Sequence, residues 1–393
     1  MRGRVIGMIL LVAALGMAIT AIARPRPASG KMKLDKAVAA PGNPLRFDIS
    51  WVDDSTGRYY LGEAGNASVD VFDARNLTFL GRIGGFHGAP AANDPCGRIE
   101  GMGPSGVVVT PDEKLWATDA KGTVKEFDLA ASKSPSSLKP MATVTTGAIC
   151  RADEIGYDPK DHVIMVGNPG EADLKPYRPP FASFISADGH VEVLGKIVFS
   201  TKDGFAFNAQ GLEQPLWVPA LDRFLVPVQG ESEGLLAVIK VDKAAKKFTV
   251  EKTYKTPNCN GSGLALGPSG HLLVGCDDGH PLLIVNVENG QVLKTIPEIH
   301  GSDEVWYNPG DHHFYAAAGG PPVPAVGVID AATNEFLENL PTGPGAHSVA
   351  ADAKTNYVFA PIGAPNPKIT KNACVTSGLP AANGCVAVYA PEK

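Results

Sequence analysis

Carboxylate side chains and one histidine recur along this chain at a spacing that could bring them together in space. The residues are Asp48, Glu154, Glu213, Glu304 and His347, and neighbours in this series are separated by roughly 50 or roughly 100 residues. Carboxylate oxygens suit Ca²⁺, and a histidine among them favours Zn²⁺. These residue types therefore predict a divalent cation site, for calcium or zinc, provided that the fold brings the five positions to one place.

Two other roles fit the same carboxylates. Acidic side chains at the starts of strands accept hydrogen bonds from backbone amides and hold neighbouring parts of a fold together. A carboxylate near a ligand can also transfer a proton without a metal. The sequence leaves the structural role, the metal site and direct proton transfer open.

A repeating unit of short apolar strands must position these residues. Its second strand is the easiest to recognise and occurs seven times, at residues 59–61, 114–117, 163–166, 223–226, 271–274, 313–316 and 357–360. A third strand follows each one, at residues 69–73, 124–128, 181–186, 236–242, 282–287, 326–330 and 385–389. Short runs rich in β-branched and aromatic residues between turn residues are typical of strands.

The first strand of each unit can be aligned by counting back from the turn that follows it. The seven first positions are Asp48, Gly106, Glu154, Glu213, Gly263, Glu304 and Ser348. Successive positions are about 50 residues apart on average, and four strands in a unit of this length are typical of a propeller blade. We therefore predict an all-β fold, a seven-bladed β-propeller that forms a single domain over residues 24–393. Two packed β domains are the alternative.

The ends of the chain predict how the ring closes. The seventh unit has its third strand at residues 385–389, and the chain ends too soon for a fourth. Residues 31–39 precede the first unit and could supply the missing strand. An N-terminal strand that closes the last blade would leave no exposed edge there.

The arrangement resembles the seven-bladed propellers of the YVTN/NHL type. The resemblance covers roughly residues 31–391 and depends on segments such as 111–117 and 311–316, which occupy the strand–turn–strand position typical of that family. Such propellers include binding proteins, lactonase-like hydrolases and dehydrogenase subunits, so the fold does not select one function. Lactonase-like members hold a catalytic metal at positions comparable to the first positions described above.

Long loops on the same side of the propeller add candidate ligand-binding residues. The first strand of each blade begins at one mouth of the central channel, and the connection between the second and third strands opens on that side. Long connections there contain Arg98, Glu100, Asn168, Tyr177 and Arg178. A guanidinium group matches a carboxylate or phosphate, so Arg98 and Arg178 could bind such a ligand, or form surface ion pairs instead.

Six cysteines map to the same side of the predicted propeller. Spacing alone leaves their connectivity open. Their positions in the blades favour the pairs Cys96–Cys150, Cys259–Cys276 and Cys374–Cys385. Three disulfides would brace the loops around the mouth by limiting the freedom of the unfolded chain.

The N-terminus predicts export. Arg2 and Arg4 precede an uncharged apolar run, and residues 21–23 fit a small-residue cleavage site. This pattern predicts that residues 1–23 are a signal peptide. An uncleaved membrane anchor is the alternative. Cleavage would remove two positive charges from a chain whose formal net charge is −6. We expect a secreted or periplasmic monomer that binds neither nucleic acid nor, after cleavage, a membrane.

Several motifs of known chemistry are missing from the sequence. It contains no Cys-x-x-Cys-His segment for covalent haem and no glycine-rich phosphate loop, so we expect neither haem nor a nucleotide cofactor. The leading hypothesis is an exported propeller that binds a small molecule or a protein at the disulfide-braced mouth, with a cation held by the carboxylates and the histidine named at the outset. The alternatives are a metal-dependent hydrolase of the lactonase type and a protein-interaction scaffold.

Overall fold

The computed structural model describes residues 31–42, 45–97, 101–171, 174, 177–277, 279–320, 323–363, 372–380 and 384–392. The predicted signal peptide, residues 1–23, lies outside the described residues. No helix in the described part of the chain has the length and hydrophobicity needed to cross a bilayer.

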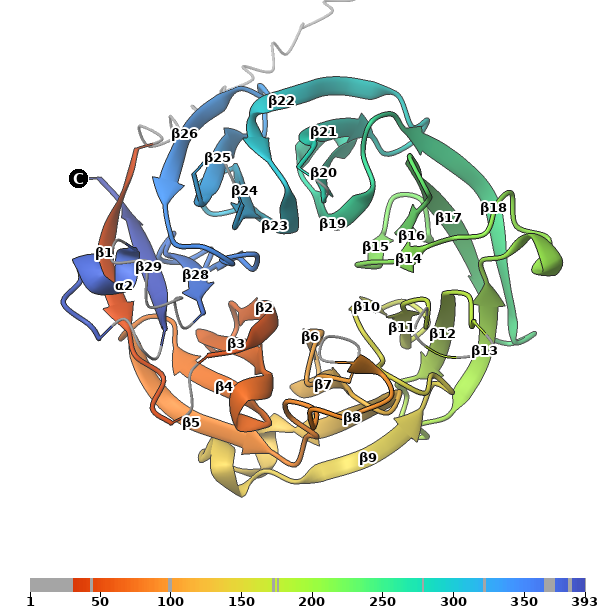
Figure 1. Ribbon diagram of the computed structural model, residues 1–393, viewed down its shortest axis with the longest axis horizontal. Coiled ribbons are helices and arrows are strands. Elements are labelled where there is room, and N and C mark those ends of the chain that lie inside the picture. Colours follow the sequence, from red (N-terminus) through yellow and green to blue (C-terminus); the bar gives the residue numbers. More distant parts are fainter. Residues whose placement is uncertain are drawn as a thin grey trace, which may run out of the picture.

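Seven antiparallel sheets stand around one axis, which confirms the predicted seven-bladed β-propeller (Figure 1). The strands of blades 1 to 3, from the axis outward, are β2 (Phe47–Asp53), β3 (Arg58–Glu63), β4 (Ser68–Asp73) and β5 (Thr78–Gly84); β6 (Val107–Thr110), β7 (Lys114–Asp119), β8 (Thr123–Asp128) and β9 (Pro140–Thr145); and β10 (Ile155–Asp158), β11 (Val163–Asn168), β12 (Phe181–Ser186) and β13 (Val193–Val198). Those of blades 4 and 5 are β14 (Gly211–Leu212) with β15 (Leu216–Val218), β16 (Arg223–Gln229), β17 (Gly234–Asp242) and β18 (Lys247–Thr256); and β19 (Gly261–Leu266), β20 (His271–Cys276), β21 (Pro281–Asn286) and β22 (Val292–His300). Those of blades 6 and 7 are β23 (Ser302–Asn308), β24 (His313–Ala318), β25 (Ala325–Asp330) and β26 (Phe336–Pro341); and β27 (Ala350–Ala351), β28 (Val358–Ile362), β29 (Cys385–Pro391) and β1 (Met32–Val38).

In the part of the chain that the structure describes, the helical segments with assigned bounds are short and lie in the connections. They are the 3₁₀ turns η1 (Ala64–Asn66), η2 (Leu129–Ala131), η3 (Pro135–Ser137), η4 (Thr201–Asp203) and η5 (Pro268–Gly270), and the single turn of α2 (Ala373–Thr376). Strands therefore position the functional side chains, together with the loops that join them.

The N-terminal strand closes the ring as predicted. β1 pairs antiparallel with β29, and the register runs from Met32 opposite Pro391 to Val38 opposite Val386. The first strand of the described chain thus becomes the outermost strand of blade 7. This pairing covers an edge of β29 that would otherwise expose unpaired backbone groups.

A left-handed turn joins the first and second strands in the repeated unit. The residue in this conformation is Glu113, His162, Asp222, His312 or Asn356 in blades 2, 3, 4, 6 and 7, with φ between 49° and 62°. Asn and Asp tolerate this region, and the tight turn fixes the hairpin register. The same turn in successive blades explains why the repeat could be aligned by counting back from it.

Hydrophobic contacts between neighbouring blades form the core. The middle strands are buried on both faces, as in β11, where residues 163–166 are fully buried. Aromatic rings join adjacent blades: Tyr59 stacks on Phe359 with centroids 5.0 Å apart, and Phe184 stacks on Phe248 at 4.1 Å. Because each sheet packs against two others, the blades hold the innermost strands in fixed positions around the channel.

Candidate functional site

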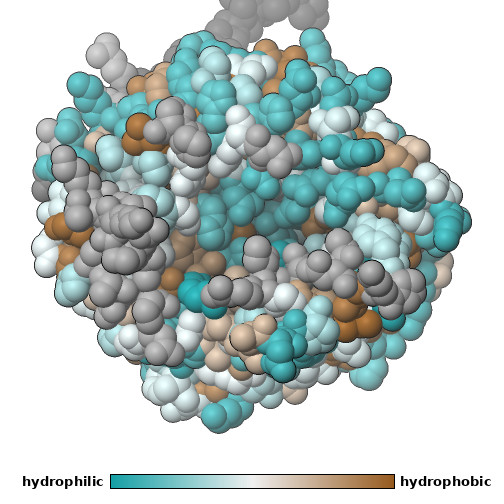
Figure 2. Space-filling view, in the orientation of Figure 1, coloured by the Kyte–Doolittle hydropathy of each residue, from teal (hydrophilic) through white to brown (hydrophobic). Residues whose placement is uncertain are grey.

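The innermost strands bring the predicted acidic residues to one mouth of the channel. Asp48 lies in β2 and Glu154 directly precedes β10; Glu213 occupies the break between β14 and β15, and His347 precedes β27. The face on which these strands begin is called the mouth face below. The first strands surround the axis in Figure 1, and Figure 2 shows hydrophilic residues gathered around the hollowed centre of the visible face.

Asp48, Asp303 and His347 form the first cluster with metal-ligand geometry. One ligand atom from each lies within 4.8 Å of the other two. His347 Nε2 is 3.7 Å from Asp48 Oδ1. All three side chains are partly exposed, so a ligand in the channel could reach an ion held between them.

Two contacts orient the imidazole of His347. Its Nδ1 donates to the carbonyl oxygen of Gly345 at 2.8 Å, and its ring stacks on Phe47 with centroids 4.7 Å apart. Metal-binding histidines commonly donate their second nitrogen to a carbonyl in this way. Nε2 is therefore the nitrogen that faces the two carboxylates.

The electrostatics of this cluster follow from its opposite charges. Burial lowers the pKa of His347, but the neighbouring Asp48 and Asp303 outweigh burial and raise it to about 9. Burial raises the pKa of Asp48, but His347 and Arg151 outweigh burial and leave it below the usual value. The carboxylates therefore stabilise positive charge at the position of the imidazole, as they would stabilise a cation.

Glu154, Glu213 and Asp303 form a second cluster beside the first. One oxygen from each also lies within 4.8 Å of the other two. Burial and the neighbouring carboxylates raise the pKa of both Glu154 and Glu213 well above the usual value. Burial raises the pKa of Asp303 to about 6. Three carboxyl groups crowded in this way repel one another when ionised.

Arg151 is a basic residue of this site that sequence reasoning missed. Its guanidinium group contacts Asp48 at 3.3 Å and Asp153 at 2.7 Å. Its position directly after Cys150 and before Asp153 and Glu154 was the available signal. Arg151 offsets part of the negative charge at the mouth.

Glu304 does not join either cluster, and its neighbour Asp303 belongs to both. One oxygen of Glu304 accepts hydrogen bonds from the Ser50 backbone at 3.3 Å, the Ser50 hydroxyl at 3.2 Å, the Val349 backbone at 2.9 Å and the Ser348 hydroxyl. Asp303 and Glu304 are successive residues of β23, and successive residues of a strand point to opposite sides, so a register shift of one residue exchanges their directions. Burial raises the pKa of Glu304 to about 8. Glu304 has the structural role considered above: it joins blades 1, 6 and 7.

The candidate ligand-binding residues take different positions. Arg98 and Glu100 lie outside the described residues. The amide of Asn168 is buried and donates to the Phe181 carbonyl at 3.0 Å, and the exposed Tyr177 donates to the Ala209 carbonyl at 3.0 Å. Arg178 pairs with Glu171 at 3.7 Å. These described contacts hold the loop that follows β11.

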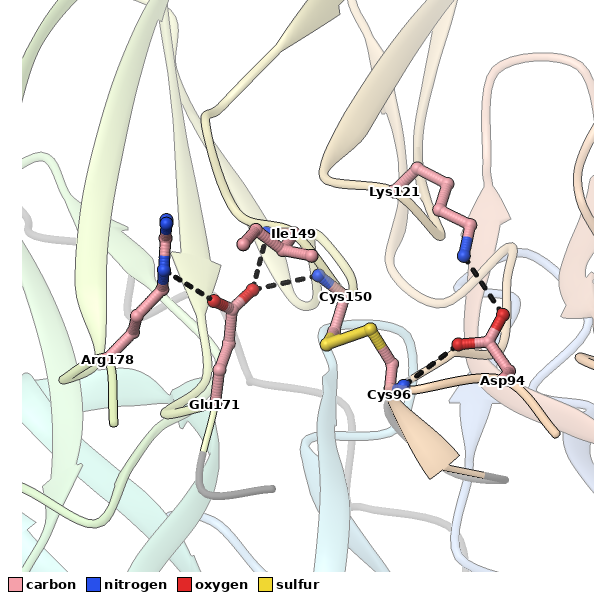
Figure 3. Close-up of a disulfide and its surroundings, with 7 residues drawn as sticks. All are labelled: Asp94, Cys96, Lys121, Ile149, Cys150, Glu171 and Arg178. Atoms are coloured by element: carbon pink, nitrogen blue, oxygen red, sulfur yellow. Dashed lines mark hydrogen bonds and ion pairs between the residues drawn. A yellow bond between two sulfur atoms is a disulfide. The ribbon is translucent and has the colours of Figure 1, made fainter. Parts of the chain in front are cut away.

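The three disulfides have the predicted connectivity, Cys96–Cys150, Cys259–Cys276 and Cys374–Cys385. Figure 3 shows how the first is embedded. Glu171 accepts from the backbone of Ile149 at 2.5 Å and of Cys150 at 2.8 Å. Asp94 accepts from the backbone of Cys96 at 2.9 Å and pairs with Lys121. This network braces the segment from which Arg151 reaches the acidic clusters.

A further buried carboxylate lies outside these clusters. Asp119 is fully buried and contacts Nδ1 of the exposed His87 at 2.8 Å, and it also pairs with Lys125. Asp119 accepts in addition from the backbone of Ala120 at 2.8 Å. These contacts attach the connection that follows β5 to blade 2.

Comparison with known proteins supports the fold alone. No protein-family model and no curated protein sequence matches the chain. Among solved structures, a chain of a mitotic checkpoint complex aligns over 100% of both chains with a TM-score of 0.63 and 11% identity. The WD40 β-propeller domain of Doa1 aligns over 92% of this chain and 98% of its own, with a TM-score of 0.61 and 13% identity. The structure of U3-55K aligns over 93% of this chain and 99% of its own, with a TM-score of 0.62 and 10% identity. The resemblance to YVTN/NHL propellers stays a prediction.

Proposed function

We propose that this protein is an exported propeller that binds a divalent cation at the mouth of its channel and, with it, a small ligand. The observation that carries the proposal is the convergence of Asp48, Asp303 and His347, with the imidazole oriented by the Gly345 carbonyl. Three ligands of this kind leave further coordination positions of a metal ion for water or a ligand.

The ligand class follows from the site. A cation at the mouth would attract an anionic or carbonyl oxygen of a small molecule, and the surrounding carboxylates would repel an anion without a cation in place. Cation and ligand should therefore bind in that order. A nitrogen and several carboxylate oxygens suit Zn²⁺, and the carboxylates alone suit Ca²⁺.

Export rests on two features. Three disulfides favour an oxidising compartment. The predicted signal peptide at residues 1–23 would deliver the chain to such a compartment, either the periplasm or the exterior.

Elemental analysis and calorimetry test the cation. The purified protein is treated with chelator, dialysed, and titrated with Zn²⁺ or Ca²⁺. We expect saturable binding that Asp48→Asn and His347→Gln each weaken by at least tenfold. Asp94→Asn is the matched control, because Asp94 is a carboxylate of the mouth face that pairs with Lys121 outside both clusters. Absence of binding, or equal affinity in all variants, would contradict the proposal.

The three-ligand cluster also favours a second candidate, a metal-dependent hydrolase of the lactonase type. An ion with open positions would polarise a carbonyl group and activate water. A lactone and ester hydrolysis screen with and without chelator distinguishes the two. Turnover that chelator abolishes supports the hydrolase, and cation binding without turnover supports the binding protein.

An apolar groove favours the third candidate, an interaction scaffold. It has a volume of about 610 Å³ and lies between β1 and β26, where Met32, Leu34, Leu340 and Tyr389 line it. An apolar groove of this kind at the surface is typical of a docking site. A partner captured equally well by wild-type protein and His347→Gln would assign the interaction to the groove.

A further inference from the structure

Asp303 is the residue that the two clusters share. A ligand atom of Asp303 lies within 4.8 Å of ligand atoms of Asp48 and His347 in the first cluster, and within 4.8 Å of ligand atoms of Glu154 and Glu213 in the second. A carboxylate has two oxygens and can bind a different ion with each. The geometry thus offers two neighbouring positions for cations rather than one.

Glu154 gives an independent sign that the second position is built for a ligand. Its side chain is only 4% exposed, and its Oε2 has no hydrogen-bond partner although it is buried. A buried polar oxygen without a hydrogen-bond partner is unfavourable, because nothing replaces the water that it loses, so such groups normally have a partner. Glu304, at the equivalent place in blade 6, differs because its Oε2 accepts four hydrogen bonds, although its Oε1 is also buried without a partner.

We propose that Glu154, Glu213 and Asp303 bind a second divalent cation, which Asp303 bridges to the first. This inference rests on the proposed function, since the first cation occupies the Asp48–Asp303–His347 cluster. The second position has oxygen ligands only, which suits Ca²⁺, Mg²⁺ or Mn²⁺ more than Zn²⁺.

Two cations bridged by Asp303 would also restrict the class of small molecule that can bind at the mouth. Two cations about 3.5–4 Å apart can bind the two oxygens of one phosphate or carboxylate group together. Six carboxyl groups interact in and next to the two clusters, namely those of Asp48, Asp153, Glu154, Glu213, Asp277 and Asp303, and two cations would offset their negative charge more fully than Arg151 and His347 do. We infer that the ligand presents such a two-oxygen anionic group.

Binding stoichiometry with Mn²⁺ tests the second position. Chelator-treated protein is equilibrated with Mn²⁺, and bound metal is counted by elemental analysis. We expect two ions per wild-type chain and one per chain of the Glu154→Gln/Glu213→Gln double variant. Glu304→Gln is the matched control and should keep two. The double variant removes like-charge repulsion, so it should unfold at a temperature no lower than that of the wild type, which calorimetry checks.

Electron paramagnetic resonance tests the bridge. Two Mn²⁺ ions that share Asp303 should give an exchange-coupled spectrum in the wild type, and the double variant should give the spectrum of an isolated ion. Two uncoupled ions, or one ion in both proteins, would overturn the inference. If the wild type binds one ion, and His347→Gln removes it while the double variant keeps it, the second position is wrong and the proposed function stands. If the wild type binds no ion, both the second position and the proposed function are wrong.

Discussion

The carboxylate of Glu304, in blade 6, accepts hydrogen bonds from the backbone and the hydroxyl group of Ser50, which lies 254 residues earlier in blade 1. The same oxygen accepts from Ser348 and Val349 of blade 7. A single buried oxygen thus joins the first and the last two blades next to the channel. The ring closes here near the axis, as it does at the periphery through β1.

Removing this oxygen should destabilise the ring. Glu304→Ala leaves the buried N–H groups of Ser50 and Val349 without an acceptor, and each such loss costs about 1–3 kcal/mol. We expect the free energy of unfolding to fall by about 3 kcal/mol or more. Glu304→Gln keeps an acceptor oxygen in a similar shape and should lose much less. Denaturant unfolding measures both, and equal losses would contradict the account.

The Cys96–Cys150 disulfide should stabilise the protein more than Cys374–Cys385. The first closes a sequence separation of 54 residues and the second a separation of 11. Loop-closure entropy then predicts losses of roughly 4 and roughly 3 kcal/mol when each pair is replaced by serine. Thermal unfolding of the two double variants tests this order. A larger loss of stability for the Cys374–Cys385 variant than for the Cys96–Cys150 variant, whose surroundings Figure 3 shows, would contradict the loop-closure account.

Arg151→Gln should change stability and cation affinity in opposite directions. The guanidinium group offsets the charge of Asp48 and Asp153, so its loss should lower the unfolding temperature of the metal-free protein. The same loss leaves the mouth more negative. We expect cation affinity to rise by roughly tenfold, which corresponds to about 1.4 kcal/mol. Calorimetric titration measures the affinity, and weaker binding in the variant would indicate that Arg151 positions the ligands instead.

The buried Asp70, which lies in β4 outside the acidic clusters, predicts that the stability of the protein depends on pH. Burial raises its pKa from 3.8 to about 6, despite the hydrogen bond from Ser68 and the ion pair with Arg82 at 2.9 Å. A raised carboxyl pKa in the folded state contributes stability below about pH 4, and this contribution declines as the pH rises through about 6.

Asp70→Asn should remove that decline. Asparagine does not ionise, so the stability difference between variant and wild type should shift in favour of the variant, by on the order of 2 kcal/mol, from pH 4 to pH 7. Unfolding measured at several pH values checks the change. A difference that stays constant with pH would contradict the raised pKa.

The sequence predicted the blades well because their signals are local. Turn residues such as His312 and Asn356 and the alternating strand pattern recur in each unit, and they set the register within a hairpin. The closing strand was predictable because the last unit lacked one. Disulfide connectivity followed from the same arrangement.

The site was harder to predict because it depends on single-residue register and on loops. Asp303 and Glu304 are adjacent, and the irregular pairing between Ser302 and Val305 decides which of them faces the channel. Arg151 reaches Asp48 from a connection whose path depends on a disulfide and on Glu171. Neither contact leaves a periodic signal in the sequence.

Anomalous diffraction from a crystal grown with Mn²⁺ or Zn²⁺ tests the central claim most directly. The account predicts an anomalous peak within about 2.0–2.6 Å of His347 Nε2 and of oxygens from Asp48 and Asp303. A well-ordered structure with these side chains in place and no peak between them, at saturating metal concentration, would contradict it.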